Sequence, residues 1–273
     1  MDFLQTVILA IVQGMTELFP ISSVAHSVLT PYVFHWQLDN IFLKEHFLPF
    51  VVMLHLGTAI ALFLFFGSDW TGIVRSIAKK DKQNRKLLYL IIAGSIPAAL
   101  IGFFLEHALR GIFSSVVNAG FFLMINGCLL YWGEKIRKHG KKEINDLTYK
   151  EALIIGAFQS LALIPGFSRS GATITAGFAA GLKHEESVRF SMLLATPIII
   201  GAGILEVPKL MVTGMGDLFW IAVMGGIVSG LAAFFSVWIM MKWFHKNEIT
   251  AMRPFAFYCW IIGACVLFTS FCL

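Results

Sequence analysis

Apolar residues fall into six runs of about twenty residues, separated by connections that contain charged residues, Gly or Pro. A helix of about twenty apolar residues crosses roughly 30 Å of hydrocarbon, so the pattern predicts six transmembrane helices. These expected spans cover residues 47–67, 87–105, 112–133, 187–206, 218–241 and 254–273.

Two further apolar stretches, 3–30 and 150–182, are interrupted near their middles by polar turns. The first turn reads PISS at 20–23, and the second reads PGFSRS at 165–170. Each stretch therefore predicts two short helices joined by a turn. Such a turn is tolerated at membrane depth only where it is buried in protein or lines a water-filled cavity.

Basic residues predict the orientation, because cytoplasmic loops carry the Lys and Arg excess. Fifteen of the 21 Lys and Arg residues lie in three segments, 68–86, 134–150 and 242–254. Three other connections carry one basic residue each: 31–46, 106–111 and 207–217. The six spans alternate correctly between these two sets only if neither broken stretch crosses the membrane, so both are expected to be re-entrant.

The two broken stretches are each followed by three spans, and on this orientation the two sets run in opposite directions. We therefore expect an all-α polytopic membrane protein, with six transmembrane helices plus two re-entrant helix-turn-helix segments in an inverted repeat. The single domain, 1–273, would divide into a first repeat, 1–133, a basic linker, 134–149, and a second repeat, 150–273. Inverted repeats with broken helices place a substrate site between the halves, so the two turns should meet.

Composition supports a membrane protein and narrows the function. The chain is 58% hydrophobic and 14% charged, against about 45–50% and about 25% in soluble domains. Soluble enzymes, nucleic-acid binders and disulfide scaffolds are therefore excluded. The net charge of +5 reflects the basic loops, and the four Cys residues form no CxxC or Cys/His cluster.

The first turn gathers polar side chains on one break in an apolar segment. Gln13 and Glu17 share a helix face, Ser22 or Ser23 can cap the next helix, and His26 follows three residues after Ser23. Intramembrane charge is costly and usually functional. The alternative is that Glu17 pairs with a neighbour and His26 bonds a carbonyl group.

The second turn carries Arg169 within an apolar region, flanked by Ser168 and Ser170 and followed by Thr173. A buried guanidinium needs an anionic partner, and its planar fork suits phosphate oxygens. Hydroxyls and the N-terminus of the helix that starts here would add donors for an anion. A structural ion pair between Arg169 and Glu17 is the alternative.

The motif ELFPISS at 17–23, the His26 that follows it, and the motif PGFSRSGAT at 165–173 resemble the two signatures of the undecaprenyl-diphosphate phosphatases, the bacitracin-resistance family. The resemblance implies removal of the terminal phosphate from an isoprenoid lipid diphosphate on the outer side of the bacterial inner membrane. That reaction recycles the lipid carrier for peptidoglycan synthesis, which supports cell wall biogenesis and cell shape and confers bacitracin resistance.

Carried over by position, the family's principal catalytic residues match Glu17, Ser23, His26 and Arg169. Substrate-binding candidates beside them are Gln13, Ser22, Ser168, Ser170, Thr173 and Arg189. Gln13 occupies a position where some family members have a second Glu, which weakens the case for a metal site built from two carboxylates.

Two mechanisms remain open from the sequence. In the first, Ser23 attacks the terminal phosphate with His26 or Glu17 as its base. In the second, Glu17 activates a water molecule, and Mg²⁺ or Ca²⁺ bridges Glu17 and the diphosphate. A transporter or flippase of undecaprenyl phosphate is the alternative function, because inverted repeats also suit alternating access. The expected partners are the lipid diphosphate and the bilayer, without nucleic acid; a homodimer is left open.

Overall fold

The computed structural model describes residues 1–39, 41–78, 81–110, 115–136, 140–212, 216–246 and 250–272. Within these ranges the regular elements are helices, as expected for an all-α membrane protein.

In the part of the chain that the structure describes, six helices are long and apolar enough to cross a membrane, which confirms the six predicted spans. Their ends differ from the prediction by a few residues, mostly because the helices continue beyond the apolar runs. They are α3 (Phe47–Phe65), α5 (Lys82–Arg110), α6 (Val116–Ile136), α9 (His184–Val212), α10 (Gly216–Lys246) and α11 (Arg253–Cys272).

Each broken stretch forms two short helices around a turn, as predicted. The first gives α1 (Phe3–Thr16) and α2 (Ser23–Val33); the second gives α7 (Tyr149–Gln159), the short 3₁₀ helix η3 (Ser160–Leu163) and α8 (Arg169–Ala179). A serine caps the N-terminus of the second helix of each pair, α2 and α8: Ser22 Oγ accepts from the Ala25 N–H, and Ser168 Oγ accepts from the Gly171 N–H. Such caps satisfy backbone donors that have no partner inside the helix.

Small residues let the helices pack closely around these turns. At Gly57 of α3 a Cβ would lie 1.8 Å from the Gly226 oxygen of α10, and at Gly156 of α7 it would lie 2.1 Å from the Gly94 oxygen of α5. Helix α1 packs on α10, and α7 packs on α5. These are equivalent pairs in the expected repeat, but the division into two related halves stays a prediction.

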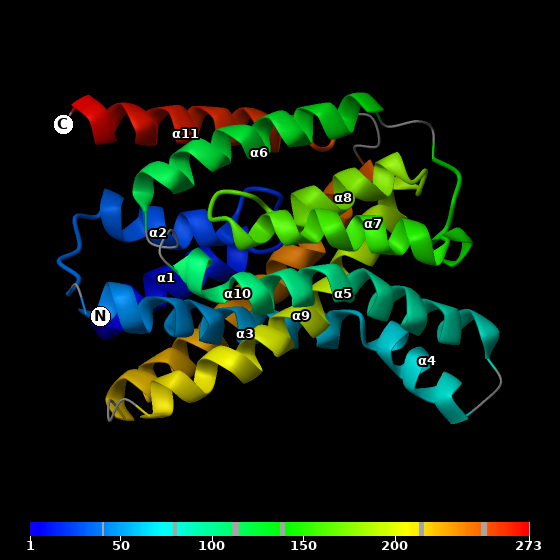
Figure 1. The fold of residues 1–273 in the computed structure, drawn as a ribbon, viewed down its shortest axis with the longest axis horizontal. Helices are drawn as coiled ribbons and strands as arrows, with labels where there is room; N and C mark the ends of the chain where they lie inside the picture. Colours follow the sequence, from blue (N-terminus) through cyan, green and yellow to red (C-terminus); the bar gives the residue numbers. More distant parts are fainter. Residues whose placement is uncertain are drawn as a thin grey trace.

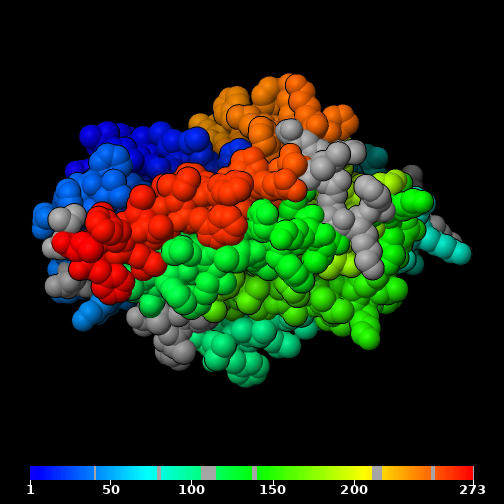
Figure 2. Space-filling model, turned by 90° about the horizontal axis from the view of Figure 1, so that it is seen from above, coloured from blue at the N-terminus to red at the C-terminus, as the bar shows by residue number. Residues whose placement is uncertain are grey.

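The arrangement of the elements agrees with the predicted alternation of connections. Both chain ends lie toward one end of the long axis, whereas α4 (Gly67–Ala78) lies toward the other (Figure 1). Helices α6 and α11 run side by side along one face (Figure 2). Residues 79–80, 137–139 and 247–249 of the basic segments lie outside the described residues, as do 40 and 213 of the other set. The orientation across the membrane and the re-entrant assignment stay predictions.

Helix α4 was not predicted, because its sequence has no long apolar run and was assigned to a basic connection. It buries Ile73 and Ser76, and Arg85 Nη2 donates to the Ser76 carbonyl oxygen at 2.9 Å. A π-helical turn, η1 (Phe42–His46), also precedes α3, and a 3₁₀ turn, η2 (Ile144–Asp146), lies in the basic linker.

Candidate active site

The two polar turns meet, as the sequence predicted. Asn126 of α6 joins them: its Nδ2 donates to the Pro20 carbonyl oxygen, and its Oδ1 accepts from the Ser168 N–H, both at 3.0 Å. Ser170 Oγ also donates to the Phe19 carbonyl oxygen at 3.3 Å. A buried amide that satisfies the backbone of both turns fixes their separation.

The Glu17 carboxylate is the centre of the site. Its Oε2 accepts from Ser23 Oγ at 2.5 Å and from Gln13 Nε2 at 3.2 Å. The same oxygen lies 3.1 Å from His55 Nε2, and the Glu17 side chain is only 4% exposed. Gln13 is itself held by Ser27 Oγ, which donates to Gln13 Oε1 at 3.2 Å. Gln13 therefore supports Glu17 from behind and does not line the cavity described below.

Arg169, the first residue of α8, contacts the other oxygen of Glu17. Its Nε and Nη2 both lie 3.4 Å from Glu17 Oε1, and its Nη1 donates to the Ser191 carbonyl oxygen at 2.9 Å. The ion pair that we considered from the sequence is therefore present. Because a buried charge needs a partner, each group of this pair provides the opposite charge that the other requires.

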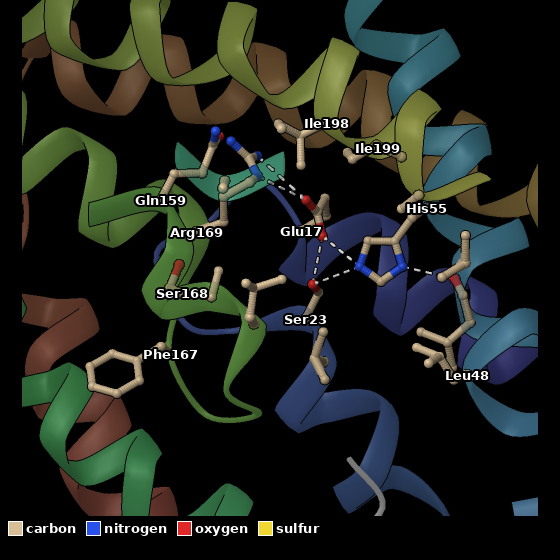
Figure 3. Close-up of a pocket in the computed structure, with 17 residues that line it drawn as sticks. Glu17, Ser23, Leu48, His55, Gln159, Phe167, Ser168, Arg169, Ile198 and Ile199 are labelled. Atoms are coloured by element: carbon tan, nitrogen blue, oxygen red, sulfur yellow. Dashed lines mark hydrogen bonds and ion pairs between the residues drawn. The ribbon is translucent and has the colours of Figure 1, made fainter. Parts of the chain in front are cut away.

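These groups line a cavity of about 160 Å³ (Figure 3). Figure 3 shows Ser23 and His55 approaching Glu17 from one side and Arg169 from another. Ser168 adds a hydroxyl, and most of the remaining wall is apolar. Its apolar residues are Val24, Leu48, Val51, Val52, Ala98, Ala162, Leu163, Phe167, Ile198, Ile199 and Ala202.

An apolar groove of about 570 Å³ adjoins this cavity. The two share Leu48 and Val52 of α3, Ala98 of α5, and Ile198 and Ala202 of α9. From there the groove follows α5 and α9 toward their C-terminal halves, where it is lined by Gly102, Phe103, Leu205 and Glu206. The site therefore combines a small cavity that holds a cluster of polar and charged side chains with an extended apolar groove.

His55 was missed by the sequence reasoning. Its Nδ1 faces the Val51 carbonyl oxygen at 2.8 Å, and its Nε2 faces Glu17 Oε2 and, at 3.4 Å, Ser23 Oγ. A ring whose two nitrogens face acceptor oxygens is satisfied as the imidazolium cation. One signal was available: His55 is the single ionisable residue in the apolar run 47–67, and such residues usually mark a functional site.

His26, expected beside Ser23 as a base, is turned away from it. Its Nδ1 bonds the Ser22 carbonyl oxygen and its Nε2 bonds the Tyr258 hydroxyl of α11, both at 2.7 Å. His26 does not line the cavity that contains Glu17 and Ser23. The spacing of three residues was interpreted as one helix face, but Ser23 is the first residue of α2 and its side chain points back to α1.

The other substrate-binding candidates fall into two groups. Ser168 lines the cavity, whereas Ser170 and Thr173 lie behind it; Thr173 Oγ1 bonds Ser191 Oγ at 2.6 Å. Ser22 is the cap of α2. Arg189 is not in the cavity wall, because near the start of α9 it pairs with Asp69 of α4 and, at 3.3 Å, with Glu186.

The donors of the site do not form a metal site by themselves. Among the described residues no group of three His, Cys, Asp or Glu side chains could hold a metal ion. Glu17 supplies one carboxylate, and both of its oxygens already face cationic or hydroxyl groups. The expected metal ligand Glu17 would therefore need most of the coordination to come from a bound molecule.

Comparisons with known proteins point to one family. Residues 6–265 match the family described as bacitracin resistance protein BacA. The chain is 53% identical to undecaprenyl-diphosphatase 2 of Oenococcus oeni over 267 residues, which cover 98% of each protein. It is 46% identical to undecaprenyl-diphosphatase 2 of Chromobacterium violaceum, over 96% of this chain and 97% of that protein. It is also 41% identical to the undecaprenyl-diphosphatase of Granulibacter bethesdensis, over 96% and 95%.

Proposed function

Because the chain belongs to the bacitracin resistance protein BacA family, we propose that it hydrolyses undecaprenyl diphosphate to undecaprenyl phosphate and inorganic phosphate. The observation that carries this proposal is a buried cavity in which one carboxylate, Glu17, contacts a serine hydroxyl, Ser23, and a guanidinium, Arg169. Cleavage of a phosphoanhydride requires a nucleophile, a base and cationic groups on the phosphates, and these three residues supply them.

Arg169 is the principal phosphate-binding group in this proposal. Its planar fork can bind two phosphate oxygens, and it lies at the N-terminus of α8, where backbone N–H groups and the helix dipole favour an anion. Ser168, which lines the cavity at the same helix end, adds a hydroxyl. On binding, the phosphates would replace Glu17 as the partner of Arg169, which frees the carboxylate to accept a proton.

In the covalent route, Ser23 Oγ attacks the terminal phosphorus as its proton passes to Glu17 Oε2, to which the hydroxyl already donates. A bond forms between Oγ and phosphorus, and the bond from phosphorus to the bridging oxygen breaks. Undecaprenyl phosphate leaves with that oxygen. Water then attacks the phosphoserine, which releases inorganic phosphate and restores Ser23.

The second route omits the phosphoserine. Glu17 takes a proton from a water molecule that attacks the terminal phosphorus directly, and Ser23 holds the carboxylate in place. The short contact between Ser23 and Glu17 favours the covalent route, because it aligns the proton to be transferred with its acceptor. His55, on the same oxygen, would stabilise the ionised form of Glu17 in either route.

The apolar groove is suited to the isoprenoid chain. It joins the phosphate cavity through α3, α5 and α9 and has an almost entirely apolar wall. Apolar lining with few polar groups is typical of lipid-binding pockets. We propose that the units of the chain nearest the diphosphate lie in this groove and that the remainder lies in the bilayer.

We also propose that a divalent cation binds together with the substrate. Mg²⁺ or Ca²⁺ would be held mainly by the diphosphate oxygens, with Glu17 as the protein ligand, and would neutralise phosphate charge. The chelator test is direct: activity of the purified protein should fall in EDTA and return with added Mg²⁺ or Ca²⁺. Full activity in EDTA would remove the cation from the proposal.

We propose that the protein lies in the bacterial inner membrane with its site open to the outer side. The groove supports this, because it runs toward the ends of α5 and α9 that the basic pattern places outside. In a background without native cysteines, Lys141→Cys should react with impermeant thiol reagents from the cytoplasmic side only, and Gln37→Cys from the outside only. Labelling of both from one side would refute the orientation. Measurement of the mass of the same purified protein would test whether it forms a homodimer.

The decisive test of the function is phosphate release by purified protein from undecaprenyl diphosphate, compared with movement of undecaprenyl phosphate between the leaflets of sealed vesicles. We expect phosphate release, and we expect Ser23→Ala to reduce it strongly. Transfer between leaflets without phosphate release would instead support the transporter alternative.

A further inference from the structure

His26, which is buried, and Tyr258, which is partly exposed, connect α11 to the turn that carries Ser23. The His26 ring lies between two oxygens, the Ser22 carbonyl on one side and the Tyr258 hydroxyl on the other, at 2.7 Å each. The His26 and Tyr258 rings are also stacked, with centroids 5.7 Å apart. Two short polar contacts and a stacked ring hold the imidazole in one orientation.

The hydrogen-bond pattern leaves His26 no free lone pair. A carbonyl oxygen can only accept, so Nδ1 carries the hydrogen that bonds Ser22. In the neutral ring Nε2 then holds the lone pair, and the Tyr258 hydroxyl donates to it. In the charged ring both nitrogens donate. In neither form can His26 take a proton from Ser23, whose hydroxyl donates to Glu17.

The bonded carbonyl belongs to a residue with an uncommon backbone. Ser22 has φ of 69° and ψ of 96°, in a region that non-glycine residues rarely adopt. Its carbonyl oxygen receives the His26 ring and also the His26 backbone N–H, at 3.2 Å. Because strained conformations persist only where their surroundings hold them, the ring contact maintains the backbone that directs the next residue, Ser23.

We infer that His26 is a positioning residue: anchored by Tyr258, it fixes the Ser22 carbonyl and thereby places the Ser23 hydroxyl against Glu17. This inference rests on the proposed phosphatase function and assigns the role of base to Glu17. Tyr258 becomes part of the machinery through its hydroxyl, although it lies more than 230 positions away along the chain.

Two amide substitutions of His26 distinguish positioning from proton transfer. The Asn amide nitrogen takes the place of Nδ1 and can still bond the Ser22 carbonyl, whereas the Gln amide nitrogen takes the place of Nε2 and can reach only Tyr258. We expect His26→Asn to keep kcat within about threefold of the wild type and His26→Gln to lower it by about tenfold or more, with KM unchanged in both. A base would be lost equally in both variants, because neither amide accepts a proton at neutral pH.

Tyr258→Phe supplies an independent arm that preserves the stacked ring. We expect it to lower kcat about threefold in the wild-type background and to have no further effect on His26→Asn, which no longer reaches Tyr258. Equal, large losses in folded His26→Asn and His26→Gln would overturn the inference. If neither variant folds, the Tyr258→Phe result decides, and an unchanged kcat would overturn it. Wild-type protein without phosphate release would defeat the proposed function instead.

Discussion

Replacement of Arg169 by Lys tests whether the guanidinium acts through its shape as well as its charge. The Arg169 side chain is 9% exposed, and its three nitrogens are directed at two groups, Glu17 Oε1 and the Ser191 carbonyl oxygen. A Lys ammonium is one point charge on a flexible stem, so it cannot hold the Ser191 carbonyl and bind two phosphate oxygens together.

The magnitude follows from the loss of one charge-assisted hydrogen bond. Such a bond contributes about 1.5–3 kcal/mol, and every 1.4 kcal/mol is about tenfold in rate or affinity. We therefore expect Arg169→Lys to lower kcat/KM for undecaprenyl diphosphate by about tenfold to a hundredfold. Because the charge is retained, Glu17 keeps a cationic partner and the thermal midpoint should change little. Arg169→Ala removes that partner and should also reduce stability.

The assay is phosphate release by purified protein in detergent, with thermal midpoints measured on the same samples. Arg189→Lys is the matched control, because it makes the same substitution in an arginine that is paired with Asp69 and Glu186 outside the cavity. We expect this control to stay within about twofold of the wild type, because Lys keeps the positive charge beside Asp69 and Glu186 and the residue does not line the cavity. A folded Arg169→Lys protein as active as Arg189→Lys would refute the assignment of the phosphate clamp.

Three further predictions concern the nucleophile, the groove and the packing. If the phosphoserine forms, Ser23→Ala should abolish phosphate release but leave lipid binding intact. If Ser23→Ala still releases phosphate and Glu17→Gln is the more damaging change, the direct water route is supported. Ala202→Phe, which fills the groove where it joins the cavity, should raise KM several-fold with kcat less affected; an unchanged KM would place the chain elsewhere. Gly57→Ala places a Cβ 1.8 Å from a backbone oxygen of α10 and should lower the thermal midpoint of unfolding. The control Gly67→Ala, whose Cβ would have no atom within 4 Å, should not. Equal midpoints for the two variants would contradict the close packing of α3 on α10.

The elements that the sequence predicted are those with local signals. The six spans follow from apolar length, and the two breaks follow from prolines and serines that cap the helices after them. The contact between Glu17 and Arg169 was considered from the sequence only as the alternative to a phosphate site, on the ground that a buried guanidinium needs an anionic partner. These inferences use hydrophobicity, capping and charge, each of which acts over a few residues or has few possible partners.

The residues that were missed act across the fold. Asn126 is one of two asparagines in its predicted span, 112–133, and only the packing of α6 beside both turns shows that it joins them. Tyr258 meets His26 because α11 lies against α2, a contact that no spacing in the chain reports. The direction of the His26 ring was missed for a related reason: the position of His26 in the motif indicates that it is near Ser23 but does not indicate where the ring points.

In the proposed reaction, the charges of the cavity allow Glu17 and Arg169 to pair with each other and also to act on the phosphates. The charged side chains in the described wall are Glu17, Arg169 and His55, and with His55 as the imidazolium they sum to one positive charge. That excess favours entry of a diphosphate, which offers Arg169 more oxygens than one carboxylate does. In the proposed reaction, Arg169 would turn to the phosphates, so Glu17 would lose the cation on Oε1 and become a better proton acceptor for Ser23, while His55 would still hold Oε2 in place. After cleavage the lipid keeps a single phosphate with fewer charges and fewer acceptor oxygens. The proposal therefore predicts that the ion pair between Arg169 and Glu17 forms again after cleavage and that its formation favours release of the product.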